Sequence, residues 1–154
     1  MQFILLYVSI FLGYFGDSSP EQLAFKYFME VIYMDNYSDK KAVYFSGMSE
    51  GKRSIAGPFS NCFALDEGFK NILYNIKTEE ADQIIIQKGN WSGIKFIRKP
   101  KSKRLSIEIY RSVKIDDFNY VYISVYKPKE FVDHFLIKAT DQEVIEYCQI
   151  NEVI

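Results

Sequence analysis

The chain has 154 residues, 17% of them aromatic, and a formal net charge of −1 at pH 7. This length is enough for one domain with a proper core and too short for two. The high aromatic content indicates that Phe and Tyr fill the core and cover part of the surface. A nearly neutral chain has no overall attraction for nucleic acid or for an anionic membrane, so we expect no nucleic-acid binding.

The N-terminus is an almost uninterrupted apolar run over residues 3–15. A run this short fits the apolar region of a secretory signal better than a membrane span, which needs about twenty residues. No Lys or Arg precedes it, so a buried first element of a cytoplasmic domain is the alternative. We expect residues 1–16 to be a signal peptide and residues 17–154 to be one extracytoplasmic domain, secreted or periplasmic, without a transmembrane span.

An amphipathic helix is predicted to start after Ser19. Ser19 is a favourable N-cap, Pro20 suits the first helical position, and Gln22 stands where a capping box has Glu or Gln. The helix is predicted to end near Met34 and to pack on the sheet. Its apolar stripe is predicted to consist of Ala24, Phe25, Phe28, Val31 and Ile32, and its polar side of Glu21, Lys26, Glu30 and Tyr33.

Residues 42–45 are predicted to form a short strand, followed by a segment rich in Gly, Ser and Pro. Residues 47–54, with the sequence GMSEGKRS, superficially resemble a phosphate-binding loop. Arg53 separates the Lys from the hydroxyl residue, and no helix start follows that would point backbone amides at a phosphate. We therefore interpret this segment as a long loop.

Asp66 is predicted to cap a second helix, in which apolar residues recur at helical spacing as far as Lys77. Two β-rich runs, 82–88 and 93–99, are separated by Gly-Asn-Trp-Ser and predict a hairpin. Basic residues gather around Pro100. They could contact phosphate or an acidic partner, although solvated charges at a turn are the ordinary explanation.

The C-terminal third, from Arg104 to Ile150, predicts four successive strands because apolar and polar residues alternate. An odd-numbered loop around Asp116 and Asp117 would place Val113 opposite Val121 and Ile109 opposite Val125, which puts the apolar residues on one face. In the last two strands, a three-residue turn at residues 140–142 would place Phe135 opposite Tyr147, Ile137 opposite Ile145 and His134 beside Cys148.

The order of elements predicts an α+β fold in which a curved antiparallel sheet of about six strands is covered on one face by two helices. This order is similar to that of nuclear-transport-factor-like and cystatin-like folds. The similarity is one of element order alone and matches no motif, so it assigns no residue a role.

The two cysteines allow two interpretations. In an oxidising compartment, Cys62 and Cys148 would form a disulfide between the loop before the second helix and the last strand. Otherwise they are buried free thiols. A free Cys148 beside His134 would be a weak candidate for a catalytic dyad, with Glu146 orienting the imidazole. We expect no metal site, because one His and two distant Cys do not provide a ligand set.

Several polar residues are candidates for ligand binding. Arg111 and Asp133 occupy positions whose parity is otherwise apolar, so each is either part of a pocket or close to a strand end or an edge. Tyr120, Tyr122 and Tyr126, together with Tyr110, are predicted to line the opposite face of the sheet, where they either cover it or recognise a protein or sugar.

These patterns favour a small exported binding or interaction domain with no catalysis and no cofactor, whose partner is a small molecule or a protein. It would act through the concave sheet face or the tyrosine-rich face. The first alternative is a hydrolase or thiol enzyme built on Cys148 and His134. The second is a structural subunit of an envelope assembly.

Overall fold

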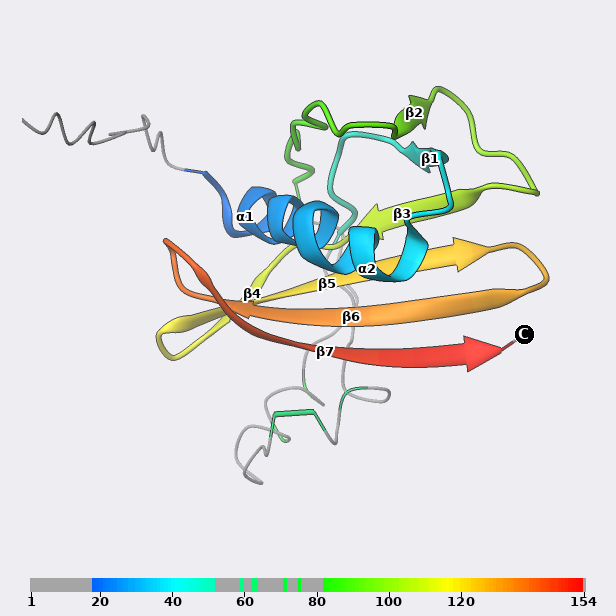
Figure 1. Cartoon of the computed structure of the whole chain (residues 1–154). Coiled ribbons are helices and arrows are strands. Elements are labelled where there is room, and N and C mark those ends of the chain that lie inside the picture. Colours follow the sequence, from blue (N-terminus) through cyan, green and yellow to red (C-terminus); the bar gives the residue numbers. More distant parts are fainter. Residues whose placement is uncertain are drawn as a thin grey trace, which may run out of the picture.

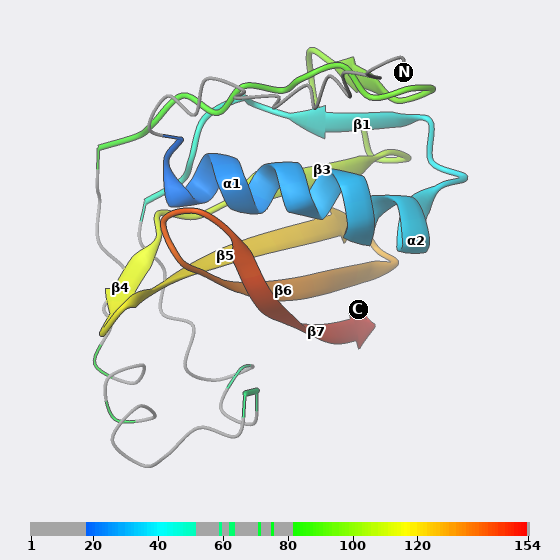
Figure 2. The ribbon, with the colours of Figure 1, turned by 60° about the vertical axis from the view of Figure 1, so that its left-hand side comes forward.

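The computed structural model describes residues 18–51, 59, 62–63, 71, 75 and 82–153. The predicted signal peptide, residues 1–16, lies outside them. So does most of the predicted second helix, although Asn71 and Asn75, the two described residues within it, are helical. In the described part the chain is an α+β fold in which one helical segment lies across one face of a single sheet (Figures 1 and 2).

The helical segment consists of α1 (Pro20–Tyr27), the π-helical η1 (Phe28–Tyr33) and α2 (Met34–Tyr37). The strands are β1 (Ala42–Phe45), β2 (Lys95–Ile97), β3 (Leu105–Ile109), β4 (Val113–Ile115), β5 (Phe118–Lys127), β6 (Phe131–Ala139) and β7 (Val144–Val153). Their order in the sheet is β2-β1-β3-β5-β6-β7, and β4 also pairs with β5. Because β1 runs parallel to both of its neighbours, the sheet is mixed and not purely antiparallel as predicted.

The start of the helix is as predicted. Ser19 Oγ accepts a hydrogen bond from the Gln22 backbone N–H at 3.2 Å, and Pro20 is the first helical residue. The Gln22 side chain does not complete a capping box. Its amide instead exchanges two hydrogen bonds with the backbone of Gln87, at 2.6 and 3.2 Å, and so joins the helix to the segment before β2.

The π-helical stretch changes which residues face the sheet. A π-helical turn contains more residues than an α-helical one, so the buried face moves along the sequence. Ala24, Phe25, Phe28 and Ile32 are buried as predicted, but Tyr33 is also buried and Val31 is exposed. Glu21, predicted to be on the polar side, is buried as well. The helical segment continues to Tyr37, three residues beyond its predicted end.

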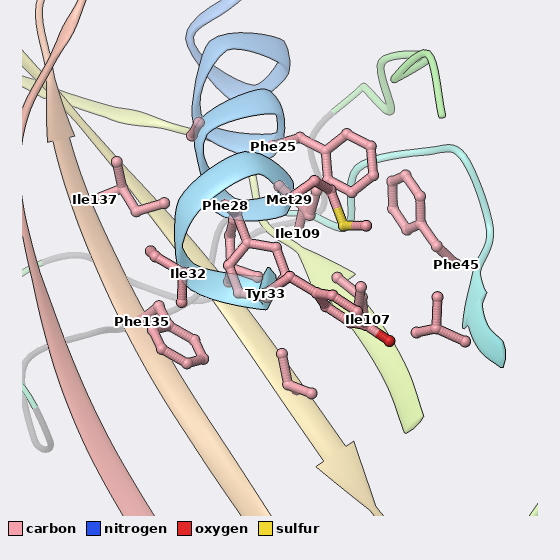
Figure 3. Close-up of a cluster of buried hydrophobic side chains, with 14 of the residues drawn as sticks. Phe25, Phe28, Met29, Ile32, Tyr33, Phe45, Ile107, Ile109, Phe135 and Ile137 are labelled. Atoms are coloured by element: carbon pink, nitrogen blue, oxygen red, sulfur yellow. The ribbon is translucent and has the colours of Figure 1, made fainter. Parts of the chain in front are cut away.

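The core lies between the helical segment and the sheet, and Figure 3 shows aromatic side chains of both meeting there. The Phe28 ring packs edge-on against Phe135 of β6, with ring centroids 5.3 Å apart. On the other flank of the helix, Phe25 contacts Phe45 of β1 at 4.7 Å. Each fully buried Phe contributes about 2–3 kcal/mol to folding stability. Burial of these aromatic side chains is therefore the main interaction that holds the helix on the sheet.

The predicted hairpin of residues 82–88 and 93–99 is wrong. Residues 84–86 instead pair with the loop after β1, where the Ser49 N–H donates to Ile84 O at 2.9 Å and the Ile86 N–H donates to Gly47 O at 2.8 Å. β2 pairs with β1 in parallel. Both segments therefore form backbone hydrogen bonds with β1 or with residues next to it in the chain.

The predicted register of the first two C-terminal strands is also wrong. Asp116 and Asp117 form a two-residue turn, so Ile115 lies opposite Phe118 and Val113 lies opposite Tyr120. Between β3 and β4 the ladder is broken, and in β3 Ile109 lies opposite Ile123. β3 is thus two residues from its predicted register, a shift that keeps its apolar side chains on the core face. Val113 lies on the other face.

The observed register of β6 and β7 also differs by two residues from the predicted register. Phe135 lies opposite Gln149, Ile137 opposite Tyr147 and Leu136 opposite Cys148. The turn contains four residues, with the Thr140 N–H donating to Glu143 O at 2.9 Å, and a bulge follows at the end of β6. The longer turn and the bulge together move the register by two residues.

Candidate functional site

Among the residues that the structure describes, no strand pairs with the outer edge of the outermost long strand, β7. It is ten residues long and, in the described part of the chain, pairs only with β6. Figure 1 shows it at the end of the sheet, running beside β6 to the C-terminus. The bulge lies at the hairpin end, so the ladder from Glu146 to Val153 is regular. This edge is about 27 Å long at about 3.4 Å per residue.

The two edges of the sheet differ in how they are protected. The β2 edge has three residues and is followed by Arg98, Lys99 and Pro100. Short strands, Lys and Pro are the features that prevent another strand from pairing with an edge. The ten residues of β7 include no Lys, Arg or Pro. Within the described residues, the β7 edge therefore remains open to a further strand.

Apolar side chains lie beside the open edge. Tyr147 of β7 is 38% exposed, and its ring centroid is 6.1 Å from that of Tyr27 on α1. Val153, on the same face of β7 as Tyr147, is 87% exposed. We call Tyr27, Tyr147 and Val153 the apolar shelf.

Acidic side chains lie on the other face of β7. Glu146 is 3.0 Å from Lys138 Nζ, and Glu152 is 3.2 Å from His134 Nε2, both across the ladder to β6. The Glu146 side chain is 46% exposed and that of Glu152 is 67% exposed, so each retains access to a further cation. The open edge thus has apolar residues at the two ends of its helix side, Tyr147 and Val153, and acidic residues at the two ends of its other side, Glu146 and Glu152.

His134 belongs to a hydrogen-bonded group on the second face of the sheet, away from the helix. Its Nδ1 is 2.7 Å from the Tyr122 hydroxyl, and its Nε2 contacts Glu152. In the tautomer with the ring proton on Nε2, the Nε2–H donates a hydrogen bond to Glu152 and Nδ1 accepts one from the Tyr122 hydroxyl. Beside this group, Glu108 accepts hydrogen bonds from Tyr110 and Ser124. These groups satisfy one another, which is typical of a structural network.

The predicted Cys148–His134 dyad is not formed. Cys148 is bonded to Cys62, with 5.9 Å between the Cα atoms, so it has no thiol to activate. His134 lies opposite Ile150, two residues from the predicted neighbour. The disulfide is the pairing that the sequence allowed. It joins β7 to the segment that contains Phe59 and Phe63, which pack on the second face of the sheet.

Arg111 and Asp133 lie near opposite ends of the helical segment. Arg111 follows the break after β3, and its Nη1 is 3.6 Å from Glu21 Oε1 in the first turn of α1. Glu21 Oε1 also accepts the Ser112 N–H at 2.8 Å. Asp133, on the core face of β6, accepts a hydrogen bond from the Tyr37 hydroxyl at the end of α2. Each therefore pairs with the helix, and the two do not form one polar group.

The tyrosines of β5 are less accessible than a recognition surface requires. Tyr120 and Tyr122 are each only 4% exposed and pack beneath Phe63 and Phe59, with centroid distances of 6.2 and 5.6 Å. Burial, with the nearby Glu146 and Asp116 carboxylates, raises the pKa of Tyr120. Tyr126, further along β5, is half-buried. The predicted tyrosine-rich outer face is thus largely part of a second apolar core.

Sequence reasoning missed the open edge. Its chemical signal was present, because residues 144–153 lack Lys and Pro whereas residues 95–101 contain both. The sequence did not reveal the strand order, and without the strand order neither segment can be identified as an edge strand. Among the described residues no group of His, Cys, Asp and Glu is arranged to hold a metal ion. Among the same residues, no helix has the length and apolar character that crossing a membrane requires.

Comparison with protein-family models, with curated proteins and with solved structures finds no significant match for this chain.

Proposed function

We propose that this chain is a small exported binding domain, without catalysis, that captures an extended segment of a partner protein as an additional strand beside β7. The observation that carries the proposal is the long, unprotected edge of β7 with the apolar shelf beside it. In strand addition the main-chain hydrogen bonds provide affinity, and the alternating side chains provide specificity. An edge of this length offers both.

Two features support export. The Cys62–Cys148 disulfide suits a protein of an oxidising compartment. The apolar run at residues 3–15 suits a secretory signal.

The arrangement of the two sheet faces favours an edge over a pocket. The helix-side face is filled by the aromatic core, and the polar groups of the second face are bonded to one another. The thiol-enzyme alternative has no free thiol. If the captured strand belonged to a neighbouring subunit, the protein would be a structural subunit of an envelope assembly, which is the second alternative from the sequence.

A peptide selection tests the proposal. A library of random decapeptides displayed on phage is selected against the immobilised protein, and the bound site is mapped from amide hydrogen exchange of the labelled protein. We expect selected peptides to slow exchange of the amides of β7. Peptides that bind only elsewhere, or no selected peptide at all, would overturn the proposal.

A pair of Lys variants locates the site independently. In Tyr147→Lys a charge is placed on the open edge, and binding of the selected peptides is expected to fall at least about tenfold. Met48→Lys is the matched control, because Met48 is 39% exposed, close to the 38% of Tyr147. Met48 lies just after β1, the strand next to the β2 edge, and so on the opposite side of the sheet from β7. Equal loss in both variants would refute the assignment to β7.

A further inference from the structure

We infer that the segment captured by β7 carries an apolar residue followed by a basic one, and the same pair again six residues later. This inference rests on the proposed function and adds the chemistry of the partner. It follows from how the side chains of β7 are divided between the two faces of the sheet and from the spacing of the charged and apolar positions.

The first step is the division of faces. In the β6–β7 ladder, Tyr147 and Val153 lie opposite core-face residues of β6, whereas Glu146 and Glu152 lie opposite Lys138 and Val132. An added strand continues both faces, because side chains directly opposite one another point to the same side. Its residues beside Tyr147 and Val153 will therefore lie on the helix side, and those beside the two glutamates on the other side.

The second step is charge. Residues 141–153 contain four acidic residues and no Lys or Arg: Asp141, Glu143, Glu146 and Glu152. The Lys and His that contact Glu146 and Glu152 approach from β6, on the side away from the open edge. Like charges directly opposite in a sheet are destabilising and opposite charges stabilising. The positions of the captured strand beside these two glutamates thus favour Lys or Arg.

The third step is the apolar shelf. A side chain beside Tyr147 reaches the position where Tyr27 packs against Tyr147, and an apolar residue there buries surface of Tyr147 that is now exposed. Between Tyr147 and Val153 the helix-side residues of β7 are Gln149 and Asn151, both polar. The captured strand therefore needs apolar residues only at the two ends of this interval.

We infer that the captured strand continues the antiparallel pairing of β5, β6 and β7, and this orientation sets the order of the motif. Read along the partner, the residue beside Val153 comes first, the one beside Glu152 second, the one beside Tyr147 seventh and the one beside Glu146 eighth. The pattern is apolar-basic, four intervening residues, apolar-basic. No stretch of this chain has two such pairs six residues apart without using a Pro as the apolar residue. The pattern thus favours a different protein over a second copy as the partner.

Synthetic peptides test the inference directly. The probe is a fluorescein-labelled peptide with the core Val-Lys-Thr-Ser-Thr-Ser-Val-Lys, and its binding is followed by fluorescence anisotropy at low ionic strength. The first comparison peptide has Glu in place of both Lys, and the second has the two Val-Lys pairs four residues apart. We expect the probe to bind about tenfold more tightly than either comparison peptide. The difference in affinity between the probe and the Glu peptide is expected to become smaller as salt is added.

Protein variants assign the preference to the two glutamates. In Glu146→Gln with Glu152→Gln the preference for Lys over Glu is expected to fall to about twofold or less, with folding checked by circular dichroism. Glu130→Gln is the control, because Glu130 is exposed and lies in the turn between β5 and β6. An unchanged preference in the double variant would overturn the inference.

The two proposals fail in different ways. If the Glu peptide binds β7 as tightly as the Lys peptide, or if selected library peptides bind β7 without the pattern, the inference on partner chemistry is wrong and strand capture stands. If neither synthetic peptides nor library peptides slow amide exchange in β7, strand capture itself is wrong.

Discussion

Replacing Tyr37 with Phe is expected to lower the free energy of unfolding by about 2 kcal/mol. The Tyr37 hydroxyl donates a hydrogen bond to Asp133 Oδ2, and both residues are buried. Among the described residues no other side chain or backbone group donates to this carboxylate. Without the hydroxyl the carboxylate is buried and unsatisfied, and a hydrogen bond to a charged group contributes about 1.5–3 kcal/mol. For 154 residues the loss corresponds to about 6 °C in Tm.

Urea denaturation followed by circular dichroism at pH 7 measures this loss. An unchanged dependence of the unfolding free energy on urea would show that the substitution acts on stability and not on the compactness of the denatured state. Tyr27→Phe is the matched control, since the Tyr27 hydroxyl makes no hydrogen bond within the part of the chain that the structure describes. The control is expected to change stability by less than about 0.5 kcal/mol.

A second substitution separates the hydrogen bond from simple packing. Asp133→Asn replaces the carboxylate with a neutral amide, which is less costly to bury without a partner. It is therefore expected to cost less in the Tyr37→Phe background than in the natural sequence, which gives a coupling free energy between the two positions. Equal losses for Tyr37→Phe and Tyr27→Phe, or strictly additive effects at Tyr37 and Asp133, would refute the reasoning.

Three further predictions concern the disulfide, alkaline pH and a buried carboxylate. Replacing Cys62 and Cys148 with Ala is expected to lower the unfolding free energy by up to about 4.5 kcal/mol, the chain-entropy value for a sequence separation of 86 residues. Urea denaturation of the natural protein and the double variant measures this loss, and equal midpoints would contradict it. Burial raises the pKa of Tyr33 to about 12, and burial together with the hydrogen bond to a carboxylate raises that of Tyr37. The folded state thus holds these phenol protons more tightly than the unfolded state does. The stability contributed by the two tyrosines is complete below the unfolded pKa of about 10 and falls as the pH rises above that value. Urea unfolding midpoints measured from about pH 8 to 11.5 should show this fall, and a flat profile would count against it. Glu21→Ala removes the acceptor of a backbone amide and the partner of a guanidinium, and is expected to cost about 3 kcal/mol in urea denaturation, whereas Glu21→Gln should cost clearly less.

Local signals in the sequence identified most of the elements outside residues 46–103. The helix start at Ser19 was predicted because its capping bond spans only three residues. The strand at residues 42–45 was predicted at its observed bounds. The period-two alternation also assigned Ile109, Ile123 and Val125 to the core face, where the structure has them. Such signals depend on neighbouring residues, whose interactions exist before the chain has folded. The two-helix arrangement and the similarity to nuclear-transport-factor-like and cystatin-like folds stay predictions.

These local signals did not determine the strand register. The ladders of β3 with β5 and of β6 with β7 were each predicted two residues from their observed register. A shift of one residue turns every side chain to the opposite face, and the apolar pattern excludes it. A shift of two residues keeps every side chain on its face, so the pattern has no preference. The choice is made by the turn of four residues after β6, the two-residue turn after β4 and the break at Arg111.

By itself, the sequence determined where the helix starts, where the long strands lie and which residues of β3 and β5 face the helix, because side-chain direction follows from local geometry. Only the tertiary structure decided the strand order and the partners of Asp133 and Arg111, because each depends on residues far apart in the chain. It also decided between the two interpretations of the cysteines. The open edge of β7 belongs to this second group: its composition can be read from the sequence, but a strand is an edge only through the absence of a neighbour in the folded sheet.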